Sequence, residues 1–168
     1  MMKKFFLAAA ALLAGFLLVM GLGGRPSEES SATAGLRAPD FSLRDLSGKT
    51  FKLSEHLGKP VVIFFGTTWC PACRAEMPYF KDLYHNYSAR GLTFVYIDIN
   101  ESPSRVARFA RENSFPYIVL TDTDGAVAQD YNIVGVPTMI LLDKKGLLRG
   151  IAHRVRDLPV EALFSVAP

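Results

Sequence analysis

The two cysteines of the chain, Cys70 and Cys73, stand three residues apart in the run TTWCPACRAEMP. A Cys-x-x-Cys pair can cycle between a dithiol and a disulfide, with one sulfur forming a mixed disulfide and the other resolving it. The loop that such a bond closes is too short to restrain the unfolded chain by much, so stability is a weak reason for the pair. We therefore interpret Cys70 and Cys73 as a redox-active disulfide.

The residues before the pair indicate how it is positioned. Val61–Gly66 form a continuous apolar run, which is typical of a strand buried on both faces. A helix is predicted to begin directly after it, with Pro71 at the entrance, where a missing N–H costs no hydrogen bond. The free N–H groups and the dipole of the first turn would stabilise a thiolate on Cys70. Cys70 is thus the expected exposed nucleophile and Cys73, one turn later, the resolving thiol.

Glu76 follows Cys73 by three residues and so shares its helix face. A carboxylate there could tune the thiols and shuttle a proton during exchange. The alternative is an ordinary exposed first-turn acid stabilised by the helix dipole. Spacing alone leaves both readings open.

Pro137, in the run GVPT, precedes a second apolar strand and removes one hydrogen-bond donor at its start. A cis Val136–Pro137 bond in a tight turn would explain this placement, although cis bonds make up only about 5–6% of X-Pro bonds.

The remaining pattern alternates strands with helices and predicts an α/β domain with a late antiparallel hairpin. Apolar–polar alternation predicts a first hairpin around the Ser47-Gly48 turn. Ser102 and Pro103 form a helix start, as N-cap and first helical residue. The further expected strands cover 92–100, 117–122, 138–143 and 147–154, and the further helices begin near 102, 126 and 157, the last running over 157–166.

The N-terminal segment predicts export. Lys3 and Lys4 precede an uncharged run over 5–24, and twenty helical residues span about 30 Å, the thickness of a bilayer core. The lysines are expected to stay cytoplasmic. Residues 1–24 are therefore a membrane anchor or a cleaved signal peptide, 25–35 a flexible linker, and 36–168 one domain. We expect a single span in the inner (cytoplasmic) membrane, with the domain facing the periplasm or the cell exterior.

Charge and composition limit the partners. The 19 basic and 16 acidic residues give a formal charge of +3, which indicates no nucleic-acid partner. A structural zinc site needs four ligands, and the chain has no second cysteine pair. We expect a monomer without a cofactor or a bound metal.

The run from Trp69 to Cys73 after an apolar strand, with Val136-Pro137-Thr138 before a later one, resembles the thioredoxin superfamily. The runs APDFSL, GTTWCPACRAEMP and DTDGAVAQDYNIVGVPTMILLDKKG are similar to the TlpA/ResA-like thiol–disulfide oxidoreductases, over roughly residues 38–155. The resemblance implies a thioredoxin-like fold, a central mixed sheet flanked by helices, with an N-terminal β-hairpin and a central helix–strand insertion. It also implies that Pro137 is cis beside the cysteines and that Glu76 is the active-site acid.

The same resemblance implies the partners. Members usually reduce exported cysteine-containing proteins, such as apocytochrome c or copper-centre proteins, with electrons from a membrane carrier of the CcdA/DsbD type. The expected substrate-binding residues are Trp69 and Pro71, which flank Cys70, and Val136 and Pro137. Val136 would offer main-chain hydrogen bonds to an extended segment. Thioredoxin itself has a buried aspartate where this chain has Phe64. Because that acid is missing here, we expect Glu76 or water to carry the proton.

Two other functions fit parts of the pattern. Paired thiolates suit Cu(I), which is the chemistry of a copper metallochaperone, but such a site would want a third ligand, and the domain has no Met- or His-rich segment to supply it. APDF and a threonine three residues before the cysteine, Thr67, also occur in peroxiredoxins. The proline that those thiol peroxidases carry seven residues before their cysteine is replaced here by Ile63.

Overall fold

The computed structural model describes residues 35–165. The predicted anchor over 1–24 and nearly all of the predicted linker lie outside these residues. Within 35–165, none of the helices combines the length and the apolar character that crossing a membrane requires.

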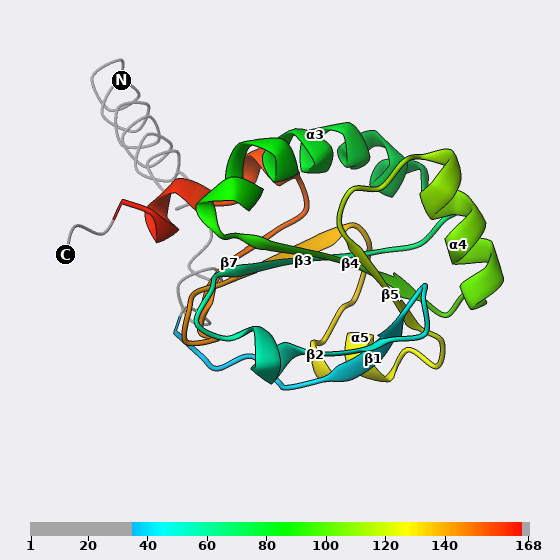
Figure 1. Ribbon diagram of the computed structural model, residues 1–168, viewed down its shortest axis with the longest axis horizontal. Helices are drawn as coiled ribbons and strands as arrows, with labels where there is room; N and C mark the ends of the chain where they lie inside the picture. The colour runs from blue at the N-terminus through cyan, green and yellow to red at the C-terminus, as the bar shows by residue number, and fades with distance from the viewer. Residues whose placement is uncertain (1–34, 166–168) are drawn as a thin grey trace, which may run out of the picture. The chain divides into compact units, whose positions relative to one another are not determined.

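One seven-stranded sheet forms the centre of the domain, in the order β2-β1-β5-β4-β3-β6-β7 (Figure 1). Strands β3, β4 and β5 are parallel, whereas the β1–β2, β1–β5, β3–β6 and β6–β7 pairs are antiparallel. The strands are β1 (Ser42–Asp45), β2 (Thr50–Lys52), β3 (Val61–Gly66), β4 (Thr93–Ile99), β5 (Ile118–Asp122), β6 (Thr138–Leu142) and β7 (Leu148–Ala152). The helices are η1 (Leu53–His56), α3 (Pro71–Tyr87), η2 (Ser88–Arg90), α4 (Pro103–Glu112), α5 (Ala126–Asp130), η3 (Val155–Asp157) and η4 (Val160–Leu163), where η marks a 3-10 helix.

This architecture confirms the predicted fold class. The mixed sheet, the first hairpin (β1–β2) and the late antiparallel hairpin (β6–β7) all form as expected. The inserted elements α4 and β5 lie between the two parts that carry the cysteines and Pro137.

The sheet is covered on both faces, which explains why every residue of β3 is buried. One apolar cluster joins Val62 and Phe64 of β3 to Met77 and Phe80 of α3 and to residues of α4. The other cluster joins the β3 residues on the opposite face, Val61, Ile63 and Phe65, to α5 and the first hairpin. In Figure 1, α3 and α5 accordingly lie on opposite sides of the sheet. The strand that leads to the cysteines is thus held from both sides.

One local prediction needs correction, and a second is confirmed in position only. The helix predicted over 157–166 is only a short 3-10 helix, η4, because Pro159 interrupts the segment just before it. Ser102 occupies the predicted N-cap of α4, but its side chain makes no capping hydrogen bond and instead lies 3.3 Å from the Ser104 hydroxyl.

Candidate dithiol active site

The cysteine pair lies at the junction predicted from the sequence, where the chain leaves β3 and enters α3. Cys70 is the N-cap of α3 and Pro71 is its first residue. The Cys70 Sγ accepts a hydrogen bond from the Cys73 backbone N–H, at 3.1 Å. Negative charge on the Cys70 sulfur is therefore stabilised by a first-turn N–H and by the positive end of the helix dipole.

Both cysteines are free thiols, and both are more buried than expected. Cys70 is 5% exposed and Cys73 is fully buried, so the expectation of an openly exposed nucleophile is wrong. The cause is the turn of residues 134–137, whose Val136 carbonyl lies over the Cys70 sulfur. Cys70 is nevertheless the more accessible of the two cysteines. Burial, together with the hydrogen bond and the charge of the neighbouring Cys70, raises the pKa of Cys73 to about 12.

The Val136–Pro137 peptide bond is cis and faces the cysteines. The Cys70 thiol donates to the Val136 carbonyl oxygen at a sulfur–oxygen distance of 3.8 Å. The His153 Nδ1 donates a hydrogen bond to the Pro137 carbonyl at 2.8 Å. The Thr138 hydroxyl donates to the Gly135 carbonyl at 2.7 Å. The turn that carries Val136 is therefore held in place on both sides of the proline.

An apolar groove of about 580 Å³ adjoins the cysteines along this turn. Trp69 and Val134 line the groove, and they are 64% and 98% exposed, respectively. Val136 lines the groove as well, and Pro71, next to Trp69, is exposed. Two of the predicted substrate-binding residues, Trp69 and Val136, thus line one groove, whereas exposed Pro71 and buried Pro137 lie close to them in the chain and do not line it.

Glu76 lies on the second turn of α3 and is half-buried. Its Oε2 accepts a hydrogen bond from the Val155 backbone N–H at 2.8 Å, which ties α3 to the start of η3. Glu76 is therefore not the ordinary first-turn acid that one reading of the sequence suggested. One of its carboxylate oxygens thus has a backbone hydrogen-bond partner in η3.

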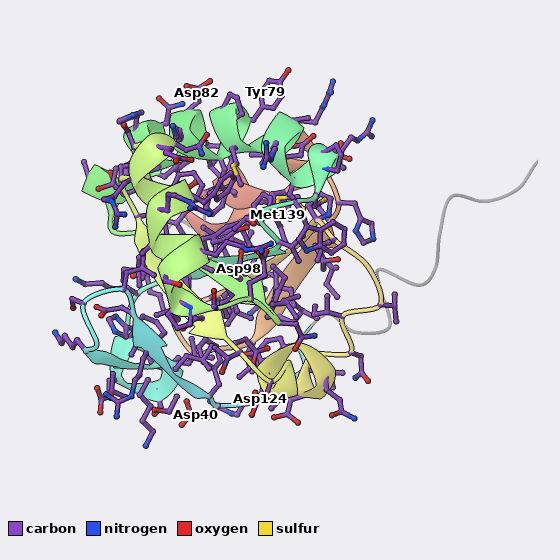
Figure 2. All side chains as sticks on the ribbon, turned by 90° about the vertical axis from the view of Figure 1, so that its right-hand side faces the viewer. Asp40, Tyr79, Asp82, Asp98, Asp124 and Met139 are labelled. Atoms are coloured by element: carbon purple, nitrogen blue, oxygen red, sulfur yellow. The ribbon has the colours of Figure 1, made fainter. Side chains whose placement is uncertain are left out.

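Two further acids near the pair were missed in the sequence. Glu101 is 8% exposed and accepts hydrogen bonds from the Thr68 N–H (2.6 Å) and hydroxyl (2.7 Å), two residues before Cys70. Asp98, at the end of β4, is 1% exposed and lies inside the domain between α3 and α5 (Figure 2). An acid that ends an otherwise apolar strand is the signal that could have identified Asp98.

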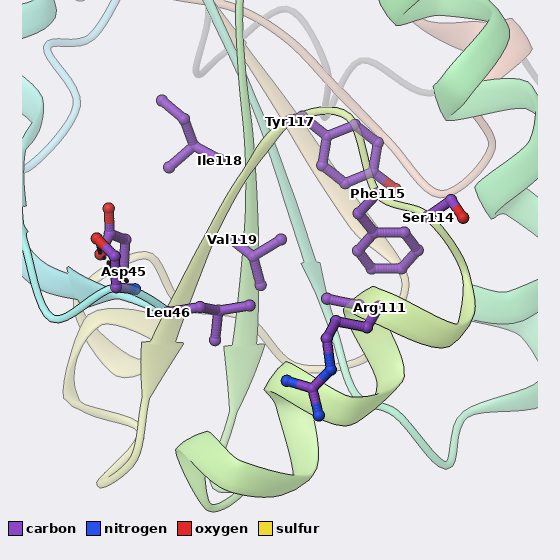
Figure 3. Close-up of a pocket in the computed structure, with 10 residues that line it drawn as sticks. Asp45, Leu46, Arg111, Ser114, Phe115, Tyr117, Ile118 and Val119 are labelled. Carbon is purple, nitrogen blue, oxygen red and sulfur yellow. Dashed lines mark hydrogen bonds between the residues drawn. The ribbon is translucent and has the colours of Figure 1, made fainter.

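A separate groove of about 380 Å³ lies between the β1–β2 turn, the end of α4 and β5 (Figure 3). Arg111, Phe115 and Tyr117 line one side of it and Leu46 the other. No cysteine or histidine lines this groove. Within residues 35–165 there is also no cluster of three or more metal-ligating side chains.

Comparison with known proteins agrees with this geometry. The model of the AhpC/TSA family matches residues 34–151. The thiol-disulfide oxidoreductase ResA of Bacillus cereus (strain ATCC 10987 / NRS 248) is 34% identical over 132 residues, which cover 79% of this chain and 75% of that protein. The chain belongs to the AhpC/TSA family and, within the thioredoxin superfamily, is ResA-like.

Other similar proteins extend the comparison. The thioredoxin-like protein YneN of Bacillus subtilis is 35% identical over 83% of this chain and 87% of its own length. The crystal structure of a putative thiol:disulfide interchange protein DsbE from Chlorobium tepidum has a TM-score of 0.70 at 26% identity, covering 78% of this chain and 94% of that one. The ResA-like chain is thus a protein thiol–disulfide oxidoreductase with a thioredoxin-like fold.

Proposed function

We propose that this oxidoreductase is a membrane-anchored reductase of exported proteins, and that Cys70, Cys73 and Glu76 carry its chemistry. The observation that carries the proposal is the Cys70 sulfur, placed at the N-terminus of α3, in contact with the cis-proline turn and next to the buried Cys73.

Reduction proceeds through two exchanges. The Cys70 thiolate attacks a client disulfide, forming a Cys70–client bond and releasing one client thiolate. The Cys73 thiolate then attacks the Cys70 sulfur, the Cys70–client bond breaks, and the second client thiolate leaves. Two electrons pass to the client, and the Cys70–Cys73 disulfide remains. Because Cys73 is fully buried, it is reached only by the sulfur of Cys70 and not by a client.

The client binds as an extended segment in the groove beside the cysteines. The Val136 backbone supplies main-chain hydrogen bonds, as in strand-addition complexes. Trp69 and Val134 supply apolar contacts, since both side chains are largely exposed at the groove. Pro71 borders the approach to the sulfur, and Pro137 sets the position of Val136. Glu76, through its second carboxylate oxygen, exchanges protons with the thiols.

The anchor over residues 1–24 holds the domain near its source of electrons. The domain faces the periplasm or the cell exterior, and a membrane carrier of the CcdA/DsbD type reduces the Cys70–Cys73 disulfide after each cycle. The clients are proteins with oxidised cysteine pairs, such as apocytochrome c or copper-centre proteins. Lys3, Lys4 and the apolar run that follows them support the anchor and its orientation. The carrier and the clients are proposed from the family resemblance.

The function is tested with purified wild type and the Cys70→Ser and Cys73→Ser variants against a disulfide-bonded protein substrate. Wild type reduces the substrate in the presence of a chemical reductant, Cys70→Ser does not, and Cys73→Ser accumulates a mixed disulfide visible by non-reducing electrophoresis and mass spectrometry. Substrate reduction by Cys70→Ser refutes the proposal. A reduction potential measured against glutathione decides whether the protein works as a reductase or an oxidant.

A peroxidase role is less well supported. Thr67 lies three residues before Cys70, but Ile63 is buried within β3 and paired with both neighbouring strands, where a peroxiredoxin would have its proline. Hydrogen peroxide consumption by the reduced protein is the assay that distinguishes the two activities.

A further inference from the structure

Asp98 lies beneath the first turn of α3 as a result of strand pairing. Strands β3 and β4 are parallel, and Asp98 is the register partner of Gly66, the last residue of β3. The carboxyl ends of parallel strands share one edge of the sheet, and Cys70 follows Gly66 by only four residues. Side chains alternate along β4, so Asp98 points to the same face as Tyr96, the face that α3 covers.

The Tyr96 hydroxyl links Asp98 to the end of β3, the strand that leads to the cysteines. It donates a hydrogen bond to the Asp98 Oδ2 at 3.3 Å. A Cβ atom placed on Gly66 would lie 2.9 Å from the hydroxyl oxygen, so this oxygen sits directly against the backbone at the end of β3. Tyr96 and Cys73 are both fully buried and belong to one packed cluster. Burial raises the pKa of Tyr96, and the charges of Asp98 and of Cys73 raise it further.

Asp98 is an acid without a full set of partners. Its Oδ1 is buried and accepts no hydrogen bond from any residue between 35 and 165. Burial and then the charge of Glu101 raise the pKa of Asp98 to about 8, while the Tyr96 hydroxyl and the more distant Arg105 lower it. Arg105 itself pairs with Glu101 at 3.7 Å. The neighbouring strand β5 places only the uncharged Thr121 opposite Asp98.

We propose that Asp98, acting through the Tyr96 hydroxyl, takes the proton of Cys73 when Cys73 resolves the mixed disulfide. This inference rests on the proposed function. It adds a third proton carrier to the two expected from the sequence, Glu76 and water.

The Cys73 thiol gives its proton to the Tyr96 oxygen while the Tyr96 proton passes to the Asp98 carboxylate. The Cys73 sulfur then bonds to the Cys70 sulfur, and the bond between Cys70 and the client breaks with its electron pair on the client sulfur. Asp98 ends protonated, and it returns the proton to Cys73 when the disulfide is reduced again. Asp98 does not touch the sulfur atoms, so it is a positioning and proton-accepting residue.

The acidities of the two groups suit this transfer. A Cys73 thiol whose pKa lies at about 12 would stay protonated at neutral pH without a nearby base. A proton acceptor is most effective when its pKa lies near the working pH, a condition that Asp98 meets.

The test separates the two exchange steps in the full chain. The reduced protein is mixed with excess 5,5′-dithiobis(2-nitrobenzoate), and the coloured thiolate is followed by stopped flow. Attack by Cys70 releases the first thiolate, and resolution by Cys73 releases the second. We expect Asp98→Asn and Tyr96→Phe to slow the second release by about 10- to 100-fold at pH 9, where the Asp98 carboxyl is ionised, and to spare the first release. Both variants should also lose the increase in the second-release rate that the wild type shows as the pH rises through about 8.

Tyr117→Phe is the matched control. It removes another buried tyrosine hydroxyl on the same face, one that has no hydrogen-bond partner within residues 35–165. We expect it to keep both phases and the pH profile, and thermal unfolding shows whether each variant is folded. If Asp98→Asn fails to fold, the Tyr96→Phe variant alone tests the proposed proton transfer.

An unchanged second release, with an unchanged pH profile, in the folded Asp98→Asn or Tyr96→Phe variants overturns the inference. Wild type that releases no first thiolate would instead refute the proposed function, and this inference with it.

Discussion

Replacing Asp98 by asparagine should stabilise the folded protein at neutral pH, by an amount that increases with pH. The Asp98 carboxyl has a pKa of about 8 in the folded protein, against 3.8 as its ordinary value. Between these two pH values the unfolded chain is ionised at Asp98 while the folded protein is protonated there. Folding then takes up a proton, so the wild type loses stability as pH rises through this window.

The size of the stability difference follows from the pH range between the two Asp98 pKa values, 3.8 and about 8. Each pH unit within it costs the wild type about 1.36 kcal/mol, so the step from pH 5 to pH 7 costs about 2.7 kcal/mol. The asparagine variant does not titrate at this position and escapes the loss. Its advantage over the wild type should therefore grow by about 2.7 kcal/mol over that interval and level off above about pH 8.

The assay is urea unfolding of both proteins at pH 5, 6 and 7, followed by circular dichroism. Asp143→Asn is the matched control: although burial opposes it, hydrogen bonds from the Leu147 N–H and the Arg149 side chain hold the pKa of Asp143 below 3.8. That substitution should cost stability equally at pH 5 and pH 7, because Asp143 is ionised in both states throughout. Equal slopes of stability against pH in wild type and Asp98→Asn would show that Asp98 is ionised in the folded protein and would refute the reasoning.

Three further outcomes are expected. Phe80→Ala should lower the free energy of unfolding by about 3–5 kcal/mol, since its ring is fully buried against α3's side of the sheet; a loss below 1 kcal/mol in urea unfolding would contradict this. Glu101→Gln should lower the free energy of unfolding by about 1–3 kcal/mol, because an amide cannot accept both Thr68 hydrogen bonds. It should also lower the pKa of Asp98, because the charge of Glu101 raises that pKa; an unchanged Asp98 pKa would contradict the interaction between the two acids. Trp69→Ala should change stability by less than about 0.5 kcal/mol but raise KM for a protein client, and an unchanged KM would remove Trp69 from the binding surface.

Much of the active site follows from local sequence. An apolar strand, a Cys-Pro-x-Cys run and a helix are consecutive, so periodicity and the helix-entrance role of Pro71 place Cys70 at the N-terminus of α3 without tertiary information. The cis conformation of Pro137 followed from the family resemblance, because the bare X-Pro dipeptide is a weak signal.

The rest depends on distant pairing. Asp98 and Glu101 come from the next strand and the loop after it, and only the β3–β4 register brings them under the cysteines. His153 reaches the Pro137 carbonyl because β7 pairs beside β6. The burial of Cys70 depends on the turn around Val136, whose path the sequence does not reveal. Local patterns predict elements, whereas these contacts require the assembled sheet.

The close approach of Tyr96 to Gly66 has an evolutionary consequence. A Cβ atom at position 66 would lie 2.9 Å from the Tyr96 oxygen and 3.0 Å from both the Tyr96 and the Phe64 rings, so glycine is required there for as long as both aromatic residues are present. A homologue with a small residue at 96 loses the closest of these contacts, and the Phe64 ring can then move aside to admit alanine or serine at 66. The two positions should therefore covary among related sequences, and lineages that lost the aromatic ring should be those in which the glycine drifts.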